Sequence, residues 1–75
     1  MNIRIGDMIV PKTKELFVWD DRLDAADDTV SWGDRLLVLQ LVNPKRPKRL
    51  YDFCFVLTPS GKCGWVRLDD CRIVT

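Results

Sequence analysis

The closing stretch of the chain constrains its fold more than any other feature, because two short runs of strand-forming residues flank one tight break. The stretch begins with the run 63–67, continues through Leu68-Asp69-Asp70 and ends with the run 71–75. Short runs rich in β-branched and aromatic residues are typical of strands, and a three-residue break has room for one helical turn. The opening run 6–10 supplies a strand against which the last run could pair. These features predict a small β-barrel that closes its first strand against its last.

Further extended runs lie at 15–19, 35–42 and 50–58. The run 35–42 is apolar on both faces, which is typical of a strand that is covered on both sides. The run 50–58 alternates large apolar residues with smaller or polar ones. Because alternate side chains of a strand share a face, we predict that one set faces the core: Tyr51, Phe53, Phe55 and Leu57.

The segment Pro59-Ser60-Gly61-Lys62 predicts a tight hairpin between the runs 50–58 and 63–67. With Ser60-Gly61 as a two-residue loop, Phe55 faces Val66 and Val56 faces Trp65. Val66 then points into the core and Trp65 points outward.

One long connection, 20–34, joins the second run to the third. Between residues 20 and 28 it carries five aspartates against Arg22, a local charge of −4. Connections of this length in a small domain are more often binding loops than structural necessities. We therefore expect a long acidic loop here.

In this order the elements resemble the Src-homology-3-like (SH3-like) barrel. The first strand opens with Gly6-Asp7, the acidic loop follows, and a three-strand meander contains the stretch from Tyr51 to Phe55. Gly64-Trp65-Val66, one helical turn and a last strand with Ile73-Val74 complete the pattern. The resemblance implies an all-β, five-stranded barrel, with one short helical turn before its last strand, that forms a single domain over residues 1–75.

Barrels of this shape include peptide binders, cell-wall binders, chromatin readers, ribosomal and transcription-factor modules and viral structural parts, so the resemblance alone implies no partner. The proline and tyrosine that follow Gly-Trp-Val in polyproline-binding members are replaced here by Arg67-Leu68-Asp69-Asp70. This departure argues against polyproline recognition.

Composition and charge narrow the classes of function. The 75 residues carry twelve Lys and Arg against eleven Asp and Glu, so a net charge of +1 creates no overall field for nucleic acid or an anionic membrane. The longest dense apolar run, 36–42, is far shorter than the ~20 residues of a membrane span. Three cysteines, Cys54, Cys63 and Cys71, leave one unpaired whichever bridge forms, which suits a reducing compartment. We therefore expect a cytoplasmic protein with free thiols.

Signatures of catalysis and metal binding are weak. The chain has no histidine, no Gly-rich phosphate loop and no Cys-x-x-Cys pair. We expect no enzymatic activity, no cofactor and no metal site.

Aromatic and acidic residues provide the first candidate binding surface. Tryptophan and tyrosine combine a large contact area with a polar tip, and carboxylates beside them suit a ligand that carries Lys or Arg. The alternative interpretation is that the tryptophans cap a thin core and the acidic loop is merely solvated. The candidate partner-binding residues are Trp19, Asp20, Asp21, Asp24, Trp32, Tyr51 and Trp65.

The segment 43–49 provides a second candidate surface, with a charge of +4 and two prolines. A basic loop can neutralise phosphates, but this one contains no aromatic residue on which a base could stack. Its candidate nucleic-acid contacts are Lys45, Arg46, Lys48 and Arg49.

The sequence thus favours a non-catalytic interaction module that binds a protein segment, or another copy of itself, through an aromatic and acidic groove. A nucleic-acid-binding barrel that uses the segment 43–49 is the alternative, and no membrane partner is expected. A compact chain of this kind would fit a bacteriophage or bacterial accessory protein.

Overall fold

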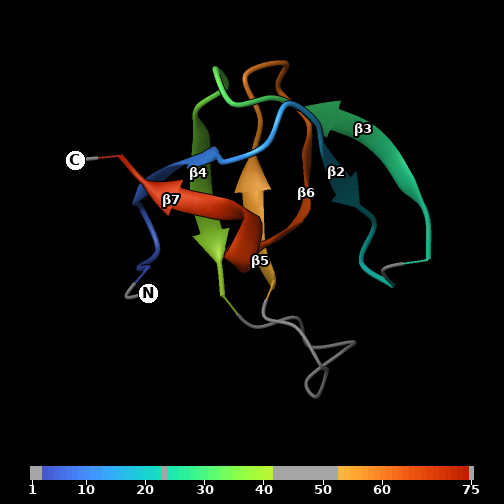
Figure 1. The fold of residues 1–75 in the computed structure, drawn as a ribbon. Helices are drawn as coiled ribbons and strands as arrows, with labels where there is room; N and C mark the ends of the chain where they lie inside the picture. Colours follow the sequence, from blue (N-terminus) through green and yellow to red (C-terminus); the bar gives the residue numbers. More distant parts are fainter. Residues whose placement is uncertain (1–2, 23, 42–52, 75) are drawn as a thin grey trace.

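The computed structural model describes residues 3–22, 24–41 and 53–74. In this part of the chain, seven strands pair into one antiparallel sheet in the order β3-β2-β6-β5-β4-β1-β7 (Figure 1). The strands are β1 (Met8–Pro11), β2 (Leu16–Trp19), β3 (Ala26–Val30), β4 (Leu36–Gln40), β5 (Phe53–Leu57), β6 (Cys63–Arg67) and β7 (Cys71–Ile73). A single 3-10 turn among these residues, η1 (Leu68–Asp70), joins β6 to β7. The all-β class and the short turn before the last strand are confirmed.

The first strand pairs with the last, as expected. β1 lies between β4 and β7, so Ile9 is opposite Leu36 on one side and Ile73 on the other. The backbone N–H of Lys12 also donates to the carbonyl of Asp70, 2.7 Å away, which ties the end of β1 to η1.

The core lies inside a strong bend of the sheet, which brings β1 and β7 across β4 and β5 (Figure 1). One cluster of buried side chains contains residues of β1 and β7 together with residues of β2, β4, β5 and β6. Bending a sheet around its own apolar face allows a short chain to bury a core without a covering helix. The most deeply buried members of the cluster are Ile9, Val18, Leu36, Val38, Cys54, Val56, Val66 and Cys71.

The expectation of five strands in a closed barrel is not what the pairing shows. The described sheet has seven strands, and its edge strands, β3 and β7, are not paired with each other. Six of the seven strands correspond to the extended runs of the sequence, and the seventh is β3, which pairs with β2 from Leu16↔Val30 to Trp19↔Ala26. It lies within the connection expected to be a loop, because its acidic residues have low strand propensity. Charged residues are nonetheless common on edge strands, where they discourage pairing with other chains.

The aspartate that follows β2 organises the turn into β3. The Oδ1 atom of Asp20 accepts the backbone N–H groups of Arg22 and Asp24 at 3.1 and 3.0 Å. The N–H of Asp20 donates to the carbonyl of Ala25, 3.0 Å away. Aspartate stabilises turns in this way because its short side chain reaches the backbone a few residues later.

The β5–β6 hairpin pairs one residue away from the predicted register. Phe55 lies opposite Trp65, and Cys54 lies opposite Val66. The loop is longer than predicted, since the N–H of Thr58 donates to the carbonyl of Lys62 and Gly61 has a φ of 88°. Three-residue hairpin loops commonly end in such a left-handed residue.

A one-residue slip moves every side chain of a strand to the opposite face. The core face of β5 therefore carries Cys54 and Val56, and Thr58 just beyond the strand is also buried. Phe53, Phe55 and Leu57 are only half-buried, so the predicted core face of this strand is wrong, and Tyr51 lies outside the described residues. Val66 points into the core as expected.

Candidate functional site

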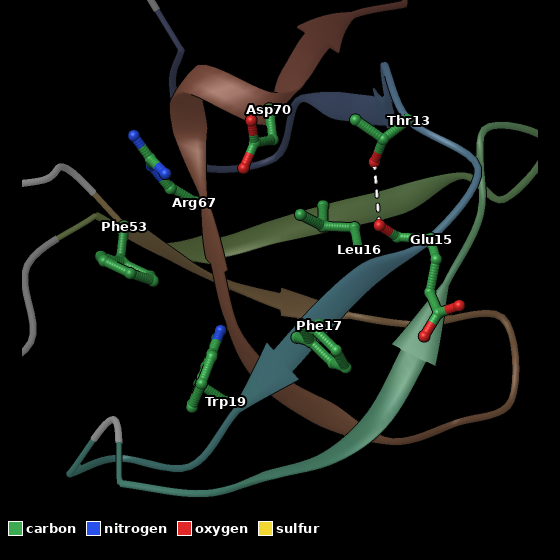
Figure 2. Close-up of a pocket in the computed structure, with 8 residues that line it drawn as sticks. All are labelled: Thr13, Glu15, Leu16, Phe17, Trp19, Phe53, Arg67 and Asp70. Atoms are coloured by element: carbon green, nitrogen blue, oxygen red, sulfur yellow. Dashed lines mark hydrogen bonds between the residues drawn. The ribbon is translucent and has the colours of Figure 1, made fainter.

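A hollow of about 370 Å³ opens where β2 meets η1 and the adjoining ends of β5 and β6 (Figure 2). We call it the aromatic hollow. Three stretches of the chain that are distant in the sequence, 13–19, 53 and 67–70, supply its walls. Its lining residues are Thr13, Glu15, Leu16, Phe17, Trp19, Phe53, Arg67 and Asp70.

The aromatic wall follows from the two-residue period of β2. Leu16 and Val18 are buried, so Phe17 and Trp19 point the other way. Their ring centroids lie 6.0 Å apart at an angle of 66°, a favourable edge-to-face arrangement. Half of the surface of Phe17 is exposed. The ring that protrudes here is therefore available for contact.

The polar part of the lining combines two carboxylates with one guanidinium. Glu15 comes from the segment before β2, Asp70 from η1, and Arg67 from the end of β6, where it pairs with Phe53. Figure 2 shows Arg67 and Asp70 on the opposite side of the hollow from the rings of Phe17 and Trp19. The hollow therefore offers aromatic faces together with both signs of charge, and a formal net charge of −1.

The predicted acidic residues lie next to this hollow, in the β2–β3 turn that follows Trp19. Asp20 accepts two backbone N–H groups within the turn. Asp21 accepts a hydrogen bond from the indole Nε1 of Trp65, 2.9 Å away. Asp24 is exposed. Asp20 and Asp21 therefore hold the hairpin in place.

Trp65 is buried, with only 2% of its surface exposed. Its expected position on an exposed outer face is therefore wrong. The ring packs against Phe55, with centroids 5.2 Å apart, and the β2–β3 hairpin lies over it, since Trp19 pairs with Trp65. The strands approach closely here because Gly64 has no side chain: a Cβ at this position would collide with Val18 and lie 3.0 Å from the carbonyl oxygen of Trp19.

Trp32 lies elsewhere. It is 60% exposed and lines a second hollow, together with Val10, Gly33, Arg35, Arg72, Ile73 and Val74. The three tryptophans therefore do not line one groove, as the sequence had predicted. Trp19 lines the aromatic hollow, Trp65 lies beneath the hairpin, and Trp32 lines a different surface.

The other predicted positions lie outside the described residues. These are Tyr51 of the first candidate surface and the four cations of the second, Lys45, Arg46, Lys48 and Arg49.

Sequence reasoning did not identify Phe17, Phe53, Glu15, Arg67 or Asp70 as site residues. The alternation Leu16-Phe17-Val18-Trp19 was a usable signal for the first of these, because it places Phe17 on the face of Trp19. The same alternation places Glu15 on that face, whereas Phe53, Arg67 and Asp70 join it only through the pairing of β2 with β6 and of β5 with β6.

The cysteines have no bridging partner among the described residues, which contain all three of them. Cys54 and Cys71 are buried. Burial raises the pKa of each thiol from 9.0 to about 12, with smaller contributions from Cys71 to the pKa of Cys54 and from Asp70 to that of Cys71. Cys63 is exposed. Within the described ranges, no three His, Cys, Asp or Glu residues gather into a group that could hold a metal ion.

No helix in the described part of the chain is long and apolar enough to cross a membrane. Comparison with family models, with curated proteins and with solved structures produced no match to this chain.

Proposed function

We propose that the chain is a non-catalytic interaction module that binds an extended protein segment carrying Lys or Arg in the aromatic hollow. The observation that carries this proposal is the half-exposed ring of Phe17 beside Trp19, in a hollow that also presents Glu15 and Asp70. Aromatic faces hold the apolar stems of long cationic side chains or stack on a guanidinium, while carboxylates bind the charged end.

We also propose that the sheet has an SH3-like arrangement. Supporting features are the long β2–β3 hairpin after the first strand, the antiparallel β4–β5–β6 meander, and η1 leading into a last strand that pairs with the first. The aromatic hollow then lies between the long hairpin and η1. Arg67 and Asp70 line it in place of apolar groups, which favours a charged segment over a purely proline-based one.

A second copy of the chain is one source of such a segment. Residues 43–49, Asn-Pro-Lys-Arg-Pro-Lys-Arg, carry a charge of +4, and prolines favour extended backbone. Exposed charge pairs contribute only ~0–1 kcal/mol each, so charge would steer this contact and the aromatic rings would hold it.

A synthetic peptide with the sequence of residues 43–49 tests the proposal. Titration calorimetry should detect binding that weakens as salt is raised. Phe17→Ala should raise the dissociation constant at least about fivefold, since truncating an aromatic anchor costs more than ~1 kcal/mol. Glu15→Gln should weaken binding and reduce its salt dependence.

Trp32→Ala provides the matched control, because this exposed aromatic residue lies outside the aromatic hollow. The variant should bind the peptide as the parent does. Absence of binding at low salt, or an equal loss in Trp32→Ala, would remove the proposal.

A further inference from the structure

We propose that the second hollow, the one lined by Trp32, binds a nucleotide unit, with a base stacked on the indole and a phosphate held by Arg35 and Arg72. This inference does not depend on the aromatic hollow or on the segment 43–49. It concerns a surface whose charge is opposite to that of the aromatic hollow.

Strand pairing brings the two arginines to the same place. Val10 of β1 pairs with Arg72 of β7, and the preceding residue, Ile9, pairs with Leu36 of β4. Continuing the β1–β4 register by one residue places Arg35 opposite Val10. Neighbouring strands lie about 5 Å apart, so the two arginines flank Val10, with Arg72 in β7 and Arg35 just before the start of β4. The buried Val10 forms the floor of the hollow.

Trp32 is held at the rim of this hollow by a closed turn. The N–H of Asp34 donates to the carbonyl of Ser31, and the carboxylate of Asp34 accepts the N–H of Ser31, both at 2.9 Å. The turn leaves the indole 60% exposed. A large ring presented on a hydrogen-bonded turn loses little conformational freedom when a flat group stacks on it.

The surroundings of the ring are cationic. The Nζ atom of Lys14 lies 6.0 Å from the centre of the Trp32 ring, and Arg35 and Arg72 are both exposed. Asp34 belongs to the turn that carries Trp32, and its carboxylate is engaged with the N–H of Ser31. The side chains that line the hollow itself include two cations, Arg35 and Arg72, and no carboxylate.

This combination fits nucleotide chemistry. Guanidinium groups bind phosphate oxygens through paired hydrogen bonds, and any base can stack on an indole. The hollow has a volume of about 370 Å³ and opens to solvent beside the ring. A basic protein segment would be repelled here, whereas it is the ligand proposed for the aromatic hollow.

Both a free mononucleotide and a nucleotide within single-stranded nucleic acid present this chemistry. The site can be tested by titrating a fluorescein-labelled dT10 oligonucleotide with the protein and measuring fluorescence anisotropy at several salt concentrations. Competition with 5′-AMP then distinguishes the two sources. We expect saturable binding at low salt. Competition by 5′-AMP at concentrations comparable to those of the oligonucleotide would assign the site to mononucleotides, and its failure to compete would assign it to single strands.

Variants locate the binding. Trp32→Ala should weaken it at least about fivefold, the low end of the base-stacking range, and Trp32→Phe should restore part of the loss. Arg72→Ser and Arg35→Ser should each reduce the slope of log affinity against log salt by about 0.7 for a single strand. Phe17→Ala, which changes the exposed aromatic residue of the other hollow, should bind normally.

Replacement of Lys45, Arg46, Lys48 and Arg49 by Ser separates this site from the basic segment. In that background the protein should still bind the oligonucleotide, and adding Trp32→Ala should still weaken the binding. No binding of either probe at low salt would overturn the inference. Binding that is abolished by the four-residue change and unaffected by Trp32→Ala would also overturn it.

Discussion

Gly64→Ala should displace β2 from β6, because these strands approach too closely at this point to admit a methyl group. The added Cβ would collide with the side chain of Val18 and lie 3.0 Å from the carbonyl oxygen of Trp19. Neither neighbour can yield easily: Val18 is buried in the core, and Trp19 is held by its pairing with Trp65. The hairpin would have to move as a unit.

Overpacking of this kind costs about 1–3 kcal/mol. The core of so small a domain supplies only ~3–5 kcal/mol, and each kcal/mol shifts Tm by about 4–8 °C at this size. Thermal unfolding followed by circular dichroism should therefore show a decrease in Tm of roughly 4 to 24 °C. Because Phe17 and Trp19 move with β2, the variant should also bind the basic peptide more weakly.

Gly33→Ala is the matched control. A Cβ at Gly33 meets nothing within 4 Å, and its backbone has no positive φ. Its Tm should remain within a few degrees of the parent value. A Gly64→Ala protein as stable as Gly33→Ala would refute the close crossing of β2 over β6, and with it the geometry of the aromatic hollow.

Other predictions concern the core and its thiols. Val56→Ala removes two methyl groups from a fully buried site and should cost about 2 kcal/mol in urea unfolding; a neutral effect would contradict the observed face of β5. With a thiol reagent near pH 8, Cys63 alone should react quickly in the native protein and all three cysteines after denaturation; one reactive thiol in the denatured protein would reveal a disulfide. The raised pKa values of Cys54 and Cys71 mean that above pH 9 the unfolded chain binds fewer protons than the folded one. The free energy of unfolding should therefore fall between about pH 9 and 12, by on the order of 1 kcal/mol per thiol at pH 10, and Cys54→Ala should halve this loss.

The strand runs, the short turn at 68–70 and the pairing of the first strand with the last could be predicted from residue patterns. Each depends on local chemistry that leaves a clear signal, such as β-branched runs or a three-residue break. The register of the β5–β6 hairpin left no such signal, because Pro59-Ser60-Gly61-Lys62 is compatible with two-residue and three-residue loops. Choosing the shorter loop placed Phe55 opposite Val66, whereas the residue opposite Val66 is Cys54.

Residue size misled the assignment of the core. The aromatic residues of β5 appeared better suited to the interior than Cys54 and Val56. The observed core cluster is built from medium-sized side chains, and the half-buried Phe55 packs against Trp65 instead. The strand at Ala26–Val30 was also not predicted, because acidic residues have low strand propensity. They are tolerated here because the strand lies at the edge of the sheet and pairs with β2.

Among the partner-binding residues predicted from the sequence, Trp19 lines the aromatic hollow. The aromatic hollow itself could not be predicted, because Phe53, Arg67 and Asp70 are brought to β2 by long-range strand pairing. Such pairing cannot be inferred from any one segment.

The most direct test of the proposed interaction module is a map of backbone amide chemical shifts in the labelled protein as the 43–49 peptide is added. The largest changes should occur at Phe17, Trp19 and Arg67, and they should diminish as salt is raised. Changes confined to the neighbourhood of Trp32 and Arg72, or none at low salt, would contradict the proposed interaction module.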